Sequence, residues 1–260
     1  MVLALTALLA LPGAALTAER QESDGVLHRM FDTAVDVFAA PADLSPEQAW
    51  SAVAVAGAAA ALATTSADES LSRSISKPAS RFGEDISKFG KALGEVPLNF
   101  GILGVFGLYG WWGDDADAKL TFESGLLGAA CTEIVVEAIK VTAGRARPNS
   151  GLGSHHWRPF SGSASFPSGH TSFAFSLAGT INYFYPGWPG ITALVVAGTT
   201  AYSRVHTLDH WPSDVLVGAF LGATISRAVA KRWDRKRRPD FEVVPTVDEH
   251  GGGAAVMSRF

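Results

Sequence analysis

Apolar residues in the middle of the chain form six segments, each bounded by proline, glycine or charge. We find no strand-like alternation of apolar and polar residues among them and no repeat. The pattern predicts an all-α fold, a helical bundle with about six core helices. Because the segments are apolar, the bundle is expected to be membrane-embedded or membrane-associated. Each segment is nevertheless rather short for a spanning helix, which needs about 20 apolar residues. The segments lie near residues 49–63, 97–112, 122–139, 170–184, 189–202 and 214–230.

The two ends of the chain differ from this middle part. Residues 22–39 carry apolar side chains at helical spacing and predict an amphipathic helix. Ser45 followed by Pro46 is typical of a new helix start. In the tail, 241–245 and 253–260 could pair as a hairpin or stay irregular. The predicted regions are an N-terminal apolar segment (1–18), a helix and linker (19–46), the bundle (47–235) and the C-terminal tail (236–260).

The first 18 residues resemble a signal peptide. An apolar run from Val2 to Leu11 is followed by Pro12, Gly13 and small residues through Ala18, as in an apolar core and its cleavage region. The basic residues that normally precede such a core are missing, since no Lys or Arg comes before Arg20. The alternatives are a retained apolar anchor and a short first core helix.

Composition supports this picture and excludes some partners. The 260 residues are 47% hydrophobic and only 18% charged, whereas about 25% charged is usual for a soluble domain. The formal net charge of -4 leaves no basic excess for nucleic acid. Cys131 is the single cysteine, so no intrachain disulfide can form, and its apolar neighbours favour a core position. Nothing in the sequence indicates an oligomeric state.

Three polar segments interrupt the apolar background and carry the candidate chemistry. Together they supply three cations, two histidines and a carboxylate that can hold one histidine. These are the groups that phosphoryl transfer through a histidine needs, and their occurrence in this order is hard to obtain by chance. The segments are Lys140 with Arg147-Pro148, then Pro167-Ser168-Gly169-His170, then Ser203-Arg204 with His210 and Asp214.

The third segment is the most informative. A histidine that accepts a phosphoryl group must be neutral, and its second ring nitrogen needs a partner. Pro212 favours a helix start between His210 and Asp214, which places Asp214 in the first turn and within reach of the ring. We interpret His210 as the nucleophile and Asp214 as its orienting partner. Alone, this pair would also fit a metal pair or a capping Asp beside a surface histidine.

The other two segments predict an anion-binding site. Ser168 can cap a helix, Gly169 lets the backbone approach an anion, and the first-turn amides can bind phosphate. His170 would then protonate the leaving oxygen. Lys140, Arg147 and Arg204 would hold the anion, the arginines through paired hydrogen bonds. Taken singly, these residues would also fit a helix cap, a solvated helix end and a surface ion pair.

The segment 149–166 between the first two motifs is rich in Gly and Ser and carries His155 and His156. It fits a lid over the substrate and an exposed connector equally well. A zinc site made of His155, His156, His206 and Asp209 is conceivable, but no metal-ligand spacing is recognisable. We therefore expect no metal and no other cofactor.

With these residues the chain resembles the type 2 phosphatidic acid phosphatase and vanadium-dependent haloperoxidase superfamily, on its phosphatase branch. All three motifs are present without a departure within residues 140–214, and the helical pattern extends the likeness to about 47–235. The resemblance implies an all-α bundle and metal-free hydrolysis of phosphate esters or anhydrides. It also implies a phosphohistidine on His210, with His170 as the acid. The implied phosphate ligands are Lys140, Arg147, Arg204 and the amides near Ser168 and Gly169.

The expected activity is a phosphatase acting on a lipid-linked phosphate or diphosphate, since the helices are apolar. One alternative is a soluble extracytoplasmic acid phosphatase for small phosphomonoesters. Alternatives of other classes are a vanadate-dependent haloperoxidase and a non-catalytic protein that binds phosphate or lipid. The substrate itself is not readable from the motifs.

Charge also bears on the orientation in a membrane. The basic run 231–238 at the end of the sixth segment should lie in the cytoplasm, and the motifs at the other segment ends would then face the extracytoplasmic, periplasmic side. A cleaved signal peptide followed by six spans would instead place the C-terminus outside. Either the first segment is kept as a further span, or the bundle is soluble or peripheral in the periplasm, or secreted.

Overall fold

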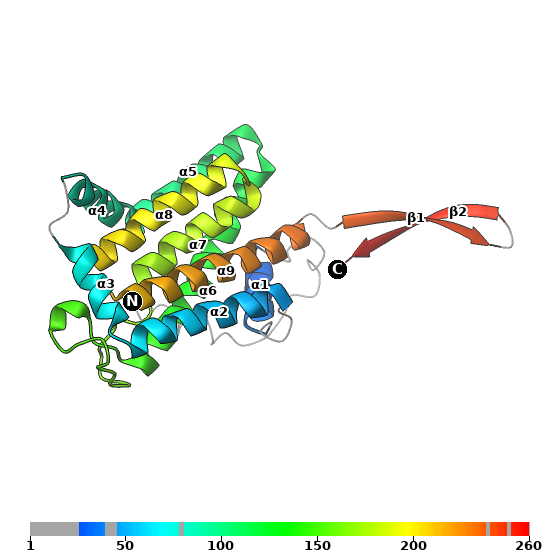
Figure 1. Cartoon of the computed structure of the whole chain (residues 1–260). Helices are drawn as coiled ribbons and strands as arrows, with labels where there is room; N and C mark the ends of the chain where they lie inside the picture. Colours follow the sequence, from blue (N-terminus) through cyan, green and yellow to red (C-terminus); the bar gives the residue numbers. More distant parts are fainter. Residues whose placement is uncertain (1–25, 40–45, 78–80, 238–239, 249–250, 260) are drawn as a thin grey trace, which may run out of the picture.

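The computed structural model describes residues 26–39, 46–77, 81–237, 240–248 and 251–259, so the predicted segment 1–18 lies outside the described part. Within it, nine α-helices confirm the predicted all-α bundle (Figure 1). Each of the six apolar segments lies in one helix. These helices are α2 (Pro46–Thr64), α5 (Val96–Gly113), α6 (Ala116–Ala143), α7 (Gly169–Phe184), α8 (Trp188–His206) and α9 (Pro212–Arg237).

The remaining helices are short. Helix α1 (Val26–Ala39) occupies most of the predicted amphipathic segment 22–39. Helices α3 (Ala67–Ser76) and α4 (Arg81–Leu93) fill a polar stretch for which no element was predicted. Their fully buried positions are Asp68, Ser72, Ser87 and Gly90. Helix α3 therefore buries a polar face, which apolar spacing does not reveal. Helix α4 does carry apolar residues at helical spacing, namely Phe82, Ile86, Phe89 and Leu93, but Phe82 and Phe89 are exposed.

The tail forms the hairpin, one of its two predicted alternatives. Strands β1 (Asp240–Asp248) and β2 (Gly251–Arg259) pair antiparallel, from Asp240 opposite Arg259 to Asp248 opposite Gly251. In Figure 1 this hairpin extends away from the helices, beyond the end of α9.

Helix α7 packs against α6, α8 and α9, and small residues let it approach α9 very closely. A Cβ atom added to Gly222 on α9 would lie 2.1 Å from the carbonyl oxygen of Ser172 on α7. One turn earlier, a Cβ on Gly218 would lie 2.7 Å from the carbonyl oxygen of Ser168. The two helix backbones are therefore in direct contact, and this contact sets the positions of the motif residues at their N-termini.

The largest apolar cluster lies between α6 and α9. It contains Leu120, Leu127, Cys131, Val229 and Trp233, and Met30 and Ala34 of α1 pack against it. Cys131 is almost completely buried, as predicted. This cluster packs around the C-terminal half of α9, so it anchors the end of the bundle away from the motifs.

Helix α5 buries mainly small or polar residues and turns most of its large apolar residues outward. Its buried positions are Asn99, Leu103, Gly107 and Gly110. Apart from Leu103, this distribution is the reverse of that in a helix of a soluble bundle, and it suits a hydrocarbon environment. The large exposed side chains of α5 are Val96, Leu98, Phe100, Val105, Leu108, Tyr109, Trp111 and Trp112.

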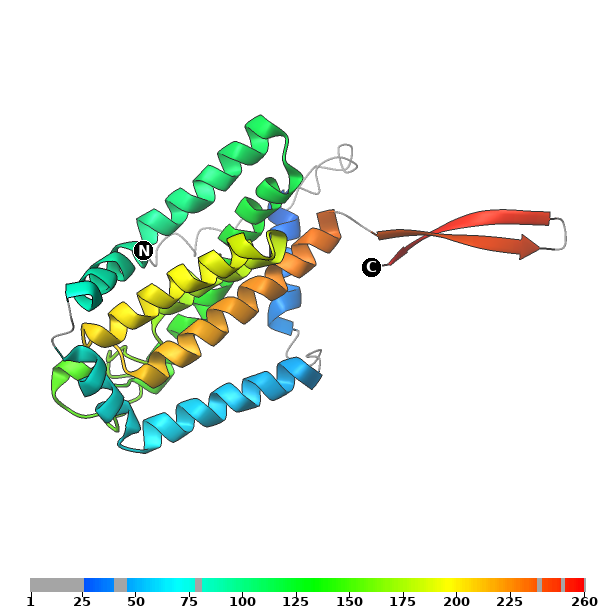
Figure 2. The ribbon, with the colours of Figure 1, turned by 45° about the horizontal axis from the view of Figure 1, so that its top comes forward.

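By length and apolar content, one helix in the described residues could cross a membrane, and it is α9. The count rises to three if two bent pairs each act as one span. The pairs are α2 with α3, bent by 83°, and α4 with α5, bent by 66°. In Figure 2, α2 and α5 flank the packed group α6–α9 on opposite sides.

The α7–α9 contact predicts a large effect for Gly222→Ala. The added methyl group would meet the Ser172 backbone, which cannot move without shifting α7, and overpacking of this kind costs about 1–3 kcal/mol. We expect a lower thermal unfolding midpoint for the purified protein. Gly198→Ala on α8 is the matched control, because nothing lies within 4 Å of the added atom. Equal midpoints for both variants would show that the contact is not tight.

Candidate active site

The ends of four helices bring the three predicted motifs together. Lys140 lies in the last turn of α6 and Arg204 in the last turn of α8. His170 lies in the first turn of α7 and Asp214 in the first turn of α9. Because consecutive helices run in opposite directions, these four ends meet at one end of the bundle (Figure 1). Residues separated by 74 positions in the sequence therefore share one site.

Lys140 reaches across to the start of α7. Its ammonium nitrogen lies 2.7 Å from the position of a Cβ added to Gly169, so a side chain at this point would displace the end of Lys140. The same nitrogen lies 2.6 Å from a carboxylate oxygen of Glu137, one turn back on α6. Lys140 thus stands beside the first-turn amides of α7, with Glu137 balancing its charge.

His170 lies in an environment of net positive charge. Burial lowers the pKa of its imidazole, and the positive charges of Arg204, His210 and Lys140 lower it further, against the opposing charge of Glu95. The same charges would attract an anion to the start of α7.

His210 is held by a backbone carbonyl. Its Nδ1 atom lies 2.7 Å from the carbonyl oxygen of Ser165, whereas Asp214 Oδ2 is 3.8 Å away. The predicted direct bond from Asp214 to the ring is thus replaced by a relay through Ser165. The carbonyl of Ser165 contacts the ring, and its hydroxyl donates to Asp214. Since a carbonyl only accepts, the hydrogen sits on Nδ1 and Nε2 keeps its lone pair.

Asp214 is completely buried, and three hydrogen-bond donors reach its carboxylate. It accepts hydrogen bonds from the Arg145 guanidinium, the Ser165 hydroxyl and the backbone amide of Trp211. Helix α9 begins at Pro212, as predicted, and this start places the carboxylate where all three donors reach it.

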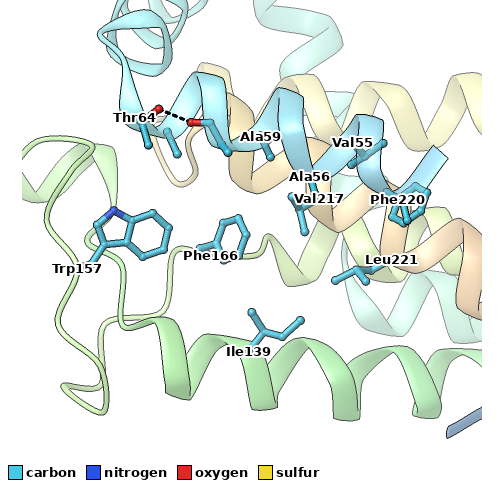
Figure 3. Close-up of a pocket in the computed structure, with 13 residues that line it drawn as sticks. Val55, Ala56, Ala59, Thr64, Ile139, Trp157, Phe166, Val217, Phe220 and Leu221 are labelled. Atoms are coloured by element: carbon cyan, nitrogen blue, oxygen red, sulfur yellow. Dashed lines mark hydrogen bonds between the residues drawn. The ribbon is translucent and has the colours of Figure 1, made fainter. Parts of the chain in front are cut away.

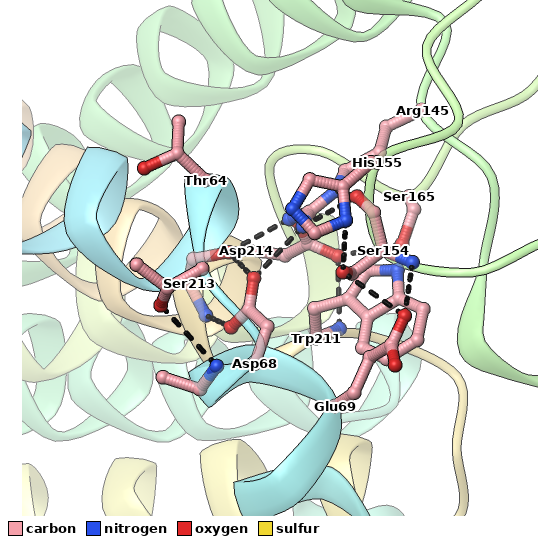
Figure 4. A network of polar contacts seen from close by, with 12 residues as sticks. Thr64, Asp68, Glu69, Arg145, Ser154, His155, Ser165, Trp211, Ser213 and Asp214 are labelled. Carbon is pink, nitrogen blue, oxygen red and sulfur yellow. Dashed lines mark hydrogen bonds and ion pairs between the residues drawn. The ribbon is translucent and has the colours of Figure 1, made fainter.

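Arg145 joins Asp214 to a second carboxylate, Asp68 on α3 (Figure 4). Its Nη2 atom donates to Asp68 at 2.8 Å, and its Nε and Nη2 atoms donate to the carbonyl of Ser154. Asp68 also accepts the amide and the hydroxyl of Ser213. Arg145, Asp68 and Asp214 are each 0% exposed, so this is a closed ionic network directly behind the site.

Sequence reasoning missed both Arg145 and Asp68. Arg145 lies between Lys140 and Arg147 and looks like a further basic residue of a solvated loop. Asp68 lies 77 positions earlier, in a stretch without any motif. The conformation of Gly144 explains the inward direction of Arg145. Gly144 ends α6 in the left-handed region at φ 58°, and a Cβ there would lie 1.8 Å from the Arg158 carbonyl oxygen.

The remaining predicted residues occupy different surroundings. Arg204 pairs with Asp209 at 3.0 Å, and its buried Nε atom has no hydrogen-bond partner within the described ranges. Arg147 is exposed and precedes the 3-10 helix η3 (Pro148–Ser150). Ser168 occupies the N-cap of α7, but its hydroxyl contacts Thr171 and its amide donates to the Asp214 carbonyl. The amides of Gly169 and His170 remain in the first turn, where the helix offers no carbonyl partner.

The loop 149–166 folds back onto the network. Trp157 pairs with Arg145 in an isolated β-bridge, and the guanidinium carbon lies 4.7 Å from the centre of its ring. Ser154 bonds to Glu69 of α3 through its amide. No group of three or more His, Cys, Asp or Glu side chains that could hold a metal occurs in the described part of the chain.

Comparison with known proteins agrees with this geometry. Residues 124–238 match the family model of the PAP2 superfamily. The match covers 115 of the 260 residues and confirms the resemblance based on the three motifs. The PAP2 region contains every predicted site residue, whereas Asp68 lies outside it.

Two curated relatives match shorter stretches. A lipid A 1-phosphatase of Porphyromonas gingivalis is 34% identical over 105 residues, which is 39% of this chain and 21% of the relative. An undecaprenyl-diphosphatase of Sulfolobus acidocaldarius is 40% identical over 62 residues, which is 24% of this chain and 30% of the relative. The matches thus span less than a third of either relative.

A solved structure extends the likeness over most of the fold. The crystal structure of a transmembrane PAP2-type phosphatidylglycerolphosphate phosphatase from Bacillus subtilis aligns with a TM-score of 0.55 and 22% identity. The alignment covers 79% of this chain and 98% of that one. This similarity establishes the helical architecture around the PAP2 region.

The ionic network predicts that Arg145→Gln is strongly destabilising. The change would leave Asp68 and Asp214 as two buried carboxylates without a cation, and breaking a buried pair costs about 3–5 kcal/mol. Thermal unfolding should show the loss. Arg73→Gln on α3 is the control, since Arg73 is exposed and lies 3.8 Å from Glu69, an ion pair worth about 0–1 kcal/mol. If both variants unfold alike, the network does not stabilise the fold.

Proposed function

We propose that the protein is a metal-independent phosphatase that acts on a lipid-linked phosphate or diphosphate through a phosphohistidine. The observation that carries the proposal is that His170, His210, Lys140 and Arg204 lie at or beside helix ends that meet at one end of the bundle. Two histidines with fixed cations can both accept a phosphoryl group and protonate the oxygen that leaves.

In the proposed first step, Nε2 of His210 attacks phosphorus. Its lone pair is available because Nδ1 is engaged with the Ser165 carbonyl at 2.7 Å. As the ring becomes positively charged, Asp214 stabilises it from 3.8 Å, and the relay through Ser165 keeps the ring in place. Asp214 is itself fixed by Arg145, so little reorganisation accompanies the attack.

The cations of the site neutralise the phosphoryl oxygens during this step. Lys140 lies in the last turn of α6, Arg204 in the last turn of α8 and Arg147 in the loop after α6, and the amides of Gly169 and His170 add donors at the start of α7. His170 gives its proton to the oxygen of the leaving alcohol or phosphate. In the second step, water attacks the phosphohistidine, and His170 takes the proton back. Because protein cations carry the charge, the proposal needs no metal ion.

The fold supports a lipid substrate and a membrane location. The outward face of α5 is apolar, and Trp111 and Trp112 at its end are exposed, as at a membrane interface. The relatives named above act on lipid A and undecaprenyl diphosphate by name. In α9, Asp214 lies at one end and three basic residues occupy the last turn. Basic residues favour the cytoplasm, so we propose an extracytoplasmic active site.

The mechanism predicts that His210→Ala abolishes phosphate release. Removing a nucleophile should cost at least about 10³-fold in rate. The wild type should also retain labelled phosphate in an acid-labile, alkali-stable form, and the variant should retain none. His28→Ala on α1 is the control, because His28 is exposed and far from the motifs in the fold. Wild-type turnover by His210→Ala would refute the phosphohistidine.

The mechanism also predicts that chelators leave the activity intact. After dialysis against EDTA, phosphate release by the purified enzyme should stay within about two-fold of its starting rate, because Lys140, Arg147 and Arg204 supply the positive charge. Loss of activity that zinc or magnesium restores would contradict a metal-free reaction.

A further inference from the structure

An apolar cavity lies between three helices of the bundle. It has a volume of about 550 Å³ and runs between α2, α6 and α9, which is the size range of ligand pockets in proteins. Figure 3 shows α2 along one side, Ile139 of α6 facing it, and Trp157 and Phe166 at one end. The lining residues are Ala52, Val55, Ala56, Ala59, Ala60, Ala63, Thr64, Ile139, Trp157, Phe166, Val217, Phe220 and Leu221. None of them is charged.

Three wall residues of this groove are close neighbours in sequence of residues of the phosphate site. Ile139 directly precedes Lys140 on α6, and Phe166 lies two residues before Ser168. Val217 lies one turn after Asp214 on α9. The Trp157 ring contacts the Phe166 ring at 5.5 Å between centroids and covers Arg145. A single molecule could therefore place an anionic head among the cations and an apolar chain in the groove.

The sequence of α2 makes room for such a chain. The lining positions between Ala52 and Ala63 recur at the spacing of one helix face, and all but Val55 are alanine. The lining from Ala52 to Thr64 extends over about 18 Å at the rise of an α-helix, long enough for an extended acyl chain. Large side chains on this face would close the groove, whereas the opposite face does not line it.

We propose that this groove binds the hydrocarbon chain of the lipid phosphate substrate while the phosphate is held by the cations. The proposal rests on the proposed function, because it assigns the tail of the same substrate. Its occupant must be apolar over most of its length and anionic at one end. This follows from the uncharged lining and from the closeness in sequence of its wall residues to Lys140 and Asp214. Specificity for long-chain substrates would then come from α2.

Two matched variants test the proposal. Ala56→Trp fills the groove from an exposed position that lines it, and Ala58→Trp places the same side chain on an exposed position of α2 that does not. Rates are measured with dioleoyl phosphatidic acid in mixed micelles and with water-soluble 4-nitrophenyl phosphate. Ala56→Trp should lower kcat/KM for the long-chain lipid by about ten-fold or more. It should leave 4-nitrophenyl phosphate unchanged, and Ala58→Trp should change neither.

Loss on both substrates, or no loss on the lipid, overturns the tail assignment. A second variant, Ala60→Phe, must show the same selective loss, which protects the test against misfolding of one variant. A wild-type enzyme that releases phosphate from neither substrate refutes the proposed function instead.

Binding without turnover gives an independent readout. In the His210→Ala variant, a phosphatidic acid with a photoreactive group at its chain end should label α2 and α9. Unlabelled phosphatidic acid should compete far better than phosphatidylcholine. Equal competition by the two lipids would overturn the proposal, because the groove would then hold any bilayer lipid.

Discussion

The interaction on which the site depends is the buried guanidinium of Arg145 between Asp68 and Asp214. Burying three charges is costly unless every donor and acceptor is satisfied. Here the hydroxyl of Ser213 and the carbonyl of Ser154 complete the network. The network connects α3, the loop after α6 and the start of α9, three elements that lie far apart in the sequence.

This fixed carboxylate determines the chemistry of His210. Asp214 does not bond to the ring but to Ser165, and Ser165 presents its carbonyl to the ring. The tautomer of the nucleophile therefore depends on the backbone of a loop residue. That loop is in turn held by the amide of Ser165, which donates to the Arg145 carbonyl at 3.1 Å. Asp214, the loop residue Ser165 and His210 are therefore held together by one set of hydrogen bonds.

The rest of the bundle serves to place this unit. Close backbone contact between α7 and α9 brings His170 and Asp214 to the same end, because Gly218 and Gly222 leave no side chain between the helices. Large apolar residues are turned outward on α5 and toward the groove beside α2. Trp157 stands at the boundary, with its ring over Arg145 and also lining the groove. The ionic network behind the active site and the apolar groove thus both contact Trp157.

The sequence alone determined the helical class, the six apolar helices and the three motifs, because these are local patterns of spacing and residue type. Helix α3 was missed because its buried residues, Asp68 and Ser72, are polar, whereas the apolar spacing of Phe82, Ile86, Phe89 and Leu93 in α4 was a helical signal that the prediction did not use. The roles of Asp68 and Arg145 were decided only by the tertiary structure, as was the place of Ser165 between Asp214 and His210. These contacts join residues 77 and 45 positions apart. The packing of the helices decides which residues meet at such a separation. A single sequence carries no periodic signal for that packing.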